Sequence, residues 1–156
     1  MTINVGDKAP AFTLKSTDFE DVSLTDYSNN NVVIIFFPMA FSSVCTAEVC
    51  QVRDDAARYN ELGAQVLAIS VDSPFALAKF KAENQLEFPV LSDFNKEVSV
   101  AYDAFYEEFA LGLKGVAKRA AFIVGKDGNV KYAEVLESPK NLPNFEAIKQ
   151  TLSDLQ

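Results

Sequence analysis

The sequence predicts an α/β protein, a three-layer α/β/α sandwich around a mixed central sheet with an N-terminal β extension. Two continuous apolar runs, residues 32–37 and 66–71, are typical of strands covered on both faces. A helical pattern lies between them, and two strands joined by a helix form a right-handed parallel unit. A third apolar run, residues 120–124, precedes an Asp-Gly turn that indicates a hairpin of antiparallel strands.

The N-terminal part predicts short strands before the central sheet. Residues 12–16 and 22–24 alternate apolar and polar side chains, as half-buried strands do. A polar, Asn-rich loop at residues 27–31 leads into the first apolar run. The length of 156 residues is ordinary for one globular unit, so we expect a single domain over residues 1–156.

The central stretch changes from strand to helix within a few residues. Pro38 has no backbone N–H, so the strand ladder must stop there. Ser42 and Ser43 are both suitable N-caps for a helix that extends from about residue 43 to residue 62. Gly63 is the C-cap candidate of this helix.

The rest of the chain predicts shorter elements. Pro74 suits the first position of a helix over residues 74–84. Pro89 places a short strand, residues 88–91, at a sheet edge because proline cannot donate to a ladder. The remaining predictions are a helical turn at 96–102, an irregular segment at 103–118, a strand at 130–136 and an amphipathic helix at 145–155. This order of elements is the thioredoxin-like arrangement.

Charge and hydropathy exclude several classes of function. The net charge of −8 argues against nucleic acid or an anionic membrane surface as a partner. No apolar run approaches the roughly 18 residues of a membrane span. The first residues lack the basic and apolar regions of a secretory signal. We therefore expect a cytoplasmic protein, in which cysteines stay reduced and available for chemistry.

The residue types that are missing narrow the chemistry further. The chain has no histidine, which excludes Cys–His and Ser–His–Asp catalysis. Two cysteines without histidine cannot form a four-ligand Cys/His zinc site. No Gly-rich phosphate-binding motif follows a predicted strand, so nothing indicates a bound nucleotide.

Cys45 lies where a buried strand gives way to a helix, the edge at which α/β sheets bind ligands. The helix N-terminus favours an anion, so a thiol at this position ionises readily. Peroxide reduction needs such a thiolate, together with donors to the peroxide oxygens in the transition state. The alternative is that Cys45 is a small buried hydrophobic residue.

Three nearby polar residues could complete such a site, and each also has a simpler interpretation. Ser42 offers a hydroxyl, or only caps the helix. Arg119 precedes the run 120–124 and reaches Cys45 if that strand neighbours residues 32–37; otherwise it is solvated. Glu48 could hold an arginine in a bidentate pair, or is an acid that favours the start of the helix.

The pattern Pro38-x-x-x-Ser42-x-x-Cys45, with Arg119 ahead of a strand, resembles the peroxiredoxin active site. The resemblance extends over almost the whole chain, including residues 5–12 and 88–93. It implies a peroxidase that uses no metal or prosthetic group. Cys45 would be the peroxidatic thiol, with Ser42 at a position usually held by threonine. Pro38, which could shield the thiolate or merely end the strand, and Arg119 complete the set, and Glu48 matches an acid that often supports the arginine.

The sequence is intermediate between two subfamilies of peroxiredoxins. Residues 36–42 resemble the AhpE-like peroxiredoxins, whereas Cys50, five residues after Cys45, resembles the resolving cysteine of the Q-type (bacterioferritin-comigratory) members. Residues five apart on a helix are separated by about 7.5 Å along its axis, and a disulfide tolerates Cα atoms no more than about 7 Å apart. A Cys45–Cys50 disulfide therefore requires the helix to unwind locally; otherwise Cys50 is a core residue.

The resemblance implies reduction of hydrogen peroxide or alkyl hydroperoxides, with recycling by a thioredoxin-like dithiol. Alternatives are a thiol–disulfide oxidoreductase, for which C-x-x-C is the usual spacing, and a redox sensor or thiol-switched binding module. The subfamilies are compatible with a monomer or a homodimer. Four aromatic residues could form an apolar collar or a dimer surface, or belong to the core: Phe41, Phe105, Tyr106 and Phe109.

Overall fold

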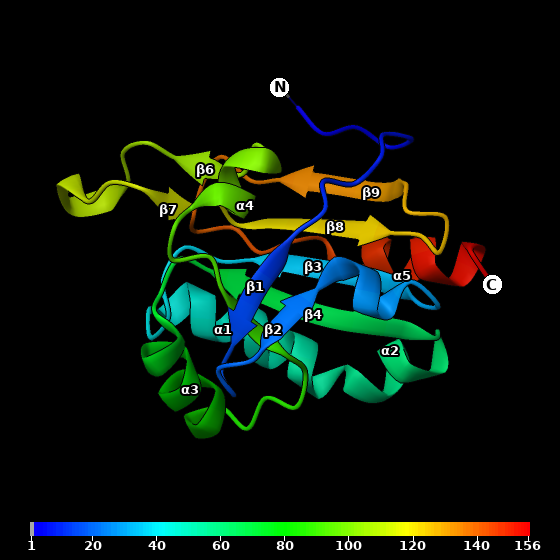
Figure 1. Ribbon diagram of the computed structural model, residues 1–156, viewed down its shortest axis with the longest axis horizontal. Helices are drawn as coiled ribbons and strands as arrows, with labels where there is room; N and C mark the ends of the chain where they lie inside the picture. The colour runs from blue at the N-terminus through cyan, green and yellow to red at the C-terminus, as the bar shows by residue number, and fades with distance from the viewer. Residues whose placement is uncertain (1) are drawn as a thin grey trace.

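A computed structural model describes residues 2–156 and is built on a seven-stranded mixed sheet, with strand order β2-β1-β5-β4-β3-β8-β9 (Figure 1). The strands of this sheet are β1 (Thr13–Ser16), β2 (Asp21–Ser23), β3 (Asn31–Phe36), β4 (Ala64–Ser70), β5 (Val90–Ser92), β8 (Ala120–Val124) and β9 (Val130–Val135). A separate two-stranded sheet pairs β6 (Phe105–Tyr106) with β7 (Val116–Ala117).

The centre of the sheet is parallel and its flanks are antiparallel. β3 pairs in parallel with β4, and β4 with β5. β8 lies antiparallel to β3, and β9 antiparallel to β8. All six residues of β3 are buried, as the continuous apolar run predicts. The mixed α/β fold class predicted from the sequence is confirmed.

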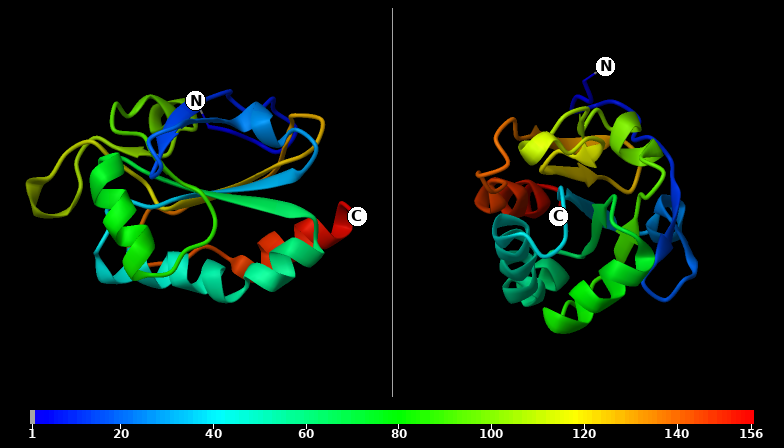
Figure 2. Two further views of the ribbon diagram at one scale, coloured as in Figure 1. Left: turned by 60° about the horizontal axis from the view of Figure 1, so that its bottom comes forward. Right: turned by 90° about the vertical axis from the view of Figure 1, so that its left-hand side faces the viewer.

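Two layers of unequal thickness cover the sheet (Figure 2). One face packs against helices from four parts of the chain, and the other against the N-terminal segment and one short helix. The helices of the first face are α1 (Ser43–Asp54), α2 (Ala56–Glu61), α3 (Pro74–Glu83) and α5 (Phe145–Asp154). The second face carries α4 (Glu97–Ala101) and a 3-10 turn, η1 (Leu24–Tyr27).

The long helix predicted over residues 43–62 is wrong in one respect, because it breaks at Asp55 between α1 and α2. The Asp55 carboxylate accepts hydrogen bonds from Lys149 Nζ at 3.0 Å and Gln51 Nε2 at 3.1 Å. Aspartate is unfavourable inside a helix, and the contact with Lys149 joins it to α5 at the break. Gly63 has a φ of +67° after α2, as its predicted role at the helix end requires.

The prediction that the strand containing Pro89 lies at a sheet edge is also wrong. β5 lies between β4 and β1. Pro89 precedes the strand and contributes only its carbonyl, which accepts the Ala68 N–H at 3.1 Å. The missing proline N–H therefore costs no ladder bond.

In the segment 103–118, predicted as irregular, the part between β6 and β7 projects from one end of the molecule (Figure 1). The segment contains β6, β7 and a 3-10 turn, η2 (Ala110–Gly112), between them. Its ring pair Tyr106–Phe109 has a centroid distance of 5.3 Å. No helix within residues 2–156 has the length and apolar character to cross a membrane.

Candidate active site

Sheet pairing brings Arg119 to the start of α1. In the antiparallel ladder of β3 and β8, Phe36 is the partner of Ala120. Arg119 therefore lies beside the end of β3, where the chain turns through residues 37–42 into the helix that carries Cys45. The adjacency on which the sequence prediction depended is present.

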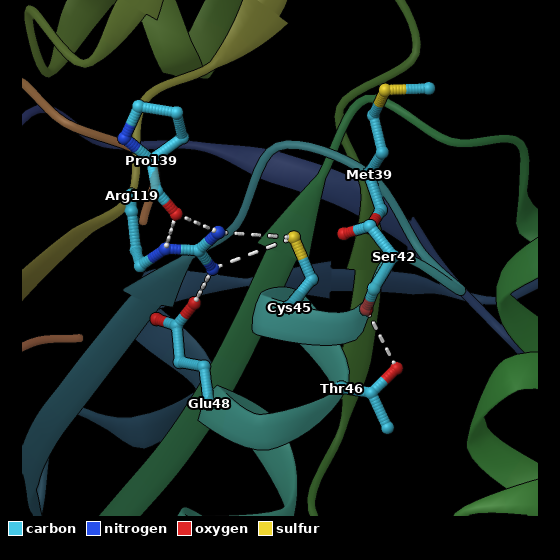
Figure 3. A network of polar contacts seen from close by, with 7 residues as sticks. All are labelled: Met39, Ser42, Cys45, Thr46, Glu48, Arg119 and Pro139. Carbon is cyan, nitrogen blue, oxygen red and sulfur yellow. Dashed lines mark hydrogen bonds and ion pairs between the residues drawn. The ribbon is translucent and has the colours of Figure 1, made fainter. Parts of the chain in front are cut away.

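The Arg119 guanidinium faces the Cys45 sulfur with both terminal nitrogens (Figure 3). Nη1 lies 3.5 Å and Nη2 3.4 Å from Sγ. Both side chains are almost completely buried, each with 1% of its surface exposed. A positive charge with two N–H donors in a buried site stabilises a sulfur anion strongly.

The guanidinium is fixed in this orientation by two further acceptors. Glu48 Oε1 accepts from Nη1 at 2.6 Å. The backbone carbonyl of Pro139, in the loop after β9, accepts from Nε at 3.2 Å and from Nη2 at 2.9 Å. Each of the three Arg119 nitrogens therefore donates to at least one acceptor, and the head group cannot rotate away without breaking several bonds.

Burial shapes the electrostatics of this cluster. Glu48 is completely buried, and among residues 2–156 its Oε2 atom has no hydrogen-bond partner. Burial raises the pKa of Glu48 to about 8, although Arg119 acts in the opposite direction. Burial alone would lower the pKa of Arg119, but the charges of Glu48 and Cys45 outweigh it and raise that pKa. Glu48 contacts Arg119 through Oε1 alone, so the bidentate pair predicted from the sequence is not formed. The first turn of α1 contains no acidic residue, because Glu48 lies further along the helix.

Ser42 occupies the N-cap position of α1 with extended backbone angles, but its side chain does not cap the helix. The hydroxyl donates to the carbonyl of Met39 at 3.0 Å. The backbone carbonyl of Ser42 accepts hydrogen bonds from the N–H and the hydroxyl of Thr46. In Figure 3 the hydroxyl and the guanidinium lie on opposite sides of the Cys45 sulfur.

Pro38 ends the β3 ladder, and Cys50 contacts a neighbouring helix. Pro38 is buried directly after Phe37, whose N–H still bonds to the carbonyl of Ile69 at 3.0 Å. The ladder thus stops at Pro38, as predicted. Cys50 is half-buried further along α1, and its sulfur lies 3.5 Å from Asn84 Oδ1 at the end of α3. Both cysteines are free thiols.

Comparison with known proteins identifies the family. The family model described as "AhpC/TSA family" matches residues 5–133. The chain belongs to the AhpC/TSA family. Alkyl hydroperoxide reductase E of Mycobacterium tuberculosis is 36% identical over 136 residues, which cover 85% of this chain and 86% of the relative. Peroxiredoxin Bcp of Escherichia coli is 33% identical over 132 residues, with 83% and 84% covered.

Solved structures agree with this assignment. A peroxiredoxin-like protein from Aquifex aeolicus superposes with a TM-score of 0.89 and 27% identity, covering 100% of this chain and 90% of that one. The two named relatives correspond to the AhpE-like and bacterioferritin-comigratory types that the sequence resembles. The chain is a peroxiredoxin, a thiol-dependent peroxidase.

Two groups in the peroxiredoxin site were missed as site residues by sequence reasoning. The Pro139 carbonyl that holds Arg119 is a backbone group in a loop, so its residue type gives no signal. Asp72 supports the loop before Cys45, because its Oδ2 accepts the Ala40 N–H at 2.8 Å. Its position two residues after the end of β4, at the sheet edge where Cys45 lies, was a usable signal.

The buried Glu48 predicts a pH-dependent stability for this enzyme. Between pH 4.5, the ordinary pKa of glutamate, and pH about 8, the folded protein keeps a proton that the unfolded chain releases. The free energy of unfolding should therefore fall as the pH rises through this window, by at most about 1.4 kcal/mol per pH unit. Glu48→Gln should remove this contribution, measured by denaturant unfolding at several pH values.

The control for this measurement is Glu83→Gln on α3. Glu83 has a half-exposed side chain that pairs with Lys79 at 3.4 Å. This variant should keep the wild-type pH dependence. Parallel stability curves for wild type and Glu48→Gln would contradict the raised pKa of Glu48.

Proposed function

We propose that Cys45 is the peroxidatic thiol and that the enzyme reduces hydrogen peroxide and organic hydroperoxides. The observation that carries the proposal is the approach of both Arg119 terminal nitrogens to within 3.5 Å of the Cys45 sulfur. The guanidinium stabilises the thiolate and can share its N–H groups with the peroxide as the O–O bond lengthens. The name of the alkyl hydroperoxide reductase relative favours organic hydroperoxides among the substrates.

In the first step the Cys45 thiolate attacks one oxygen of ROOH. An S–O bond forms, the O–O bond breaks, and RO⁻ leaves and takes up a proton to become ROH. Sulfur is oxidised to sulfenic acid and the peroxide is reduced. Arg119 is placed to stabilise the negative charge as it moves from sulfur to the leaving oxygen.

In the second step the Cys50 thiol condenses with the sulfenic acid. An S–S bond forms and the sulfenic oxygen leaves as water. Because both cysteines lie on α1, the helix must unwind locally for the two sulfurs to meet. A thioredoxin-like dithiol then reduces the disulfide by thiol–disulfide exchange, which restores both thiols.

Pro38 and Ser42 are assigned supporting roles in this proposal. The buried Pro38 ring limits the access of water to the thiolate, and the Ser42 hydroxyl is a donor that can turn from Met39 to a bound peroxide. Glu48 positions Arg119. We place the enzyme in the cytoplasm, where dithiol reductants operate, as a monomer or a homodimer.

The test is continuous peroxide consumption by wild-type enzyme with a thioredoxin system, followed by mass spectrometry of the oxidised protein. We expect sustained consumption of peroxide in proportion to reductant, and a Cys45–Cys50 disulfide as the oxidised product. A single equivalent consumed with no turnover would instead assign the chain a sensor or binding role. Turnover without an intramolecular disulfide would assign resolution to an external thiol.

A further inference from the structure

The Cys50 sulfur contacts the end of a neighbouring helix, α3. This sulfur donates to Asn84 Oδ1 at 3.5 Å, across a separation of 34 residues. The Cys45 sulfur instead faces Arg119 from β8. The two sulfurs of α1 therefore have partners on two different elements of the fold.

Asn84 is itself fixed by three hydrogen bonds. Its Nδ2 donates to the Phe80 carbonyl at 2.9 Å, which turns Oδ1 toward Cys50. Its backbone N–H donates to the same Phe80 carbonyl at 3.1 Å. Arg53, three residues after Cys50 on α1, donates from Nη1 to the Asn84 carbonyl at 2.8 Å. Groups other than Cys50 thus hold the acceptor oxygen in place.

Formation of a Cys45–Cys50 disulfide must break this contact. The S–S bond is about 2.05 Å long, and it forms only after part of α1 unwinds and the two sulfurs approach. Cys50 cannot meet the Cys45 sulfenic acid while its sulfur stays on Asn84. Release from Asn84 is therefore part of the barrier to resolution, in addition to the cost of unwinding.

We propose that Asn84 is a positioning residue that holds Cys50 on α3 and thereby slows resolution of the Cys45 sulfenic acid. The proposal rests on the resolving role of Cys50 in the proposed function. The Cys45 sulfenic acid can then react in one of two ways, with the Cys50 thiol or with a second peroxide. A sulfenate that waits can attack a second ROOH. A second S–O bond forms, the O–O bond breaks, RO⁻ leaves and takes up a proton to become ROH, and sulfur is oxidised to sulfinic acid. A stronger hold on Cys50 therefore raises the sensitivity of Cys45 to overoxidation.

The test compares wild type with Asn84→Ala in rapid-mixing experiments, with acid quench and mass spectrometry of the sulfenic, disulfide and sulfinic forms. We expect the disulfide to form about five-fold faster in the variant, equivalent to about 1 kcal/mol. The sulfinic fraction at a fixed excess of hydrogen peroxide should fall by a similar factor. The first oxidation of Cys45 should keep its wild-type rate. Asn84→Gly, compatible with a helix end, replaces the alanine variant if that variant does not fold.

Two control variants separate this role from a structural one. Asn84→Asp keeps an acceptor oxygen for Cys50 but loses the donor to Phe80 and puts a negative charge at the helix end. If Asn84 acts through Cys50, this variant forms the Cys45–Cys50 disulfide as slowly as wild type. If substitutions at residue 84 act only by loosening α3, the variant forms the disulfide faster. Glu83→Ala, on the same turn of α3, should leave all rates unchanged.

The failures of the two proposals are distinguishable. If wild-type enzyme forms no Cys45–Cys50 disulfide, the resolving role of Cys50 is wrong, and the role of Asn84 falls with it. If wild type forms the disulfide and neither Asn84→Ala nor Asn84→Gly forms it faster, only the positioning role of Asn84 is overturned. Equal acceleration in Asn84→Ala and Asn84→Asp would also overturn it.

Discussion

Replacing Cys45 by serine is expected to lower peroxide turnover by more than about 1,000-fold, because only sulfur passes through a sulfenic acid intermediate. A serine hydroxyl is a weak nucleophile without an adjacent base, and the chain contains no histidine to supply one. Arg119, Glu48 and the fold would all remain. The measurement is the second-order rate constant for hydrogen peroxide, with the unfolding free energy as a check on structure.

The matched control is the same substitution five residues later on the same helix. Cys50→Ser keeps Cys45 and its contact with Arg119, so it should still reduce one equivalent of peroxide at the wild-type rate. Its turnover should then be slower, because an external thiol must attack the sulfenic acid. A folded Cys45→Ser enzyme with sustained turnover would contradict the assignment. So would a folded Cys50→Ser enzyme that reduces no peroxide at all.

The part of the site that is local in sequence could be predicted. Residues 32–45 combine a buried strand, a proline that ends it and a helix start, and each step follows from backbone chemistry. The position of Arg119 could be predicted only on a condition, because its approach to Cys45 depended on β8 being the neighbour of β3. The hairpin signal after residues 120–124 indicated antiparallel strands in the same sheet but not which strand they joined.

What could not be predicted was set by contacts between distant segments. The Pro139 carbonyl contacts Arg119 only because the loop after β9 returns to the site. Asp55 breaks the helix where Lys149 of α5 meets its carboxylate, a partner 94 residues away. The Ser42 hydroxyl donates to the Met39 carbonyl, although an N-cap serine could instead accept from a backbone N–H of the first helical turn. In each case residue type allowed several partners and tertiary packing selected one.

Replacing Arg119 by methionine is expected to lower the rate constant for peroxide reduction by about 100- to 1,000-fold. That is the usual cost of losing a buried donor that stabilises transition-state charge, and this substitution removes both donors to the Cys45 sulfur. Arg119→Lys keeps a positive charge without the two-pronged geometry, so its rate should lie between those of methionine and wild type. Stopped-flow oxidation of Cys45 measures this step apart from resolution.

The same substitution also removes the partner of a buried acid, so its effect on folding must be separated from its effect on chemistry. Glu48 loses its ion pair, and breaking a buried pair from one side typically costs about 3–5 kcal/mol. Burial raises the pKa of Glu48 and Arg119 lowers it, so loss of the guanidinium raises this pKa further, and the carboxyl can take up a proton instead of remaining an unpaired anion. The loss of stability in Arg119→Met should therefore be smaller at low pH than at high pH.

A double variant distinguishes the two contributions of Arg119. In Arg119→Met with Glu48→Gln no buried charge is left unpaired, so the free energy of unfolding should recover most of what the single variant loses. The rate of Cys45 oxidation should not recover, because neither of the two introduced side chains supplies a cation beside the sulfur. Recovery of both quantities would mean that Arg119 serves only to neutralise Glu48. Recovery of stability alone would mean that the guanidinium acts directly on the reacting sulfur.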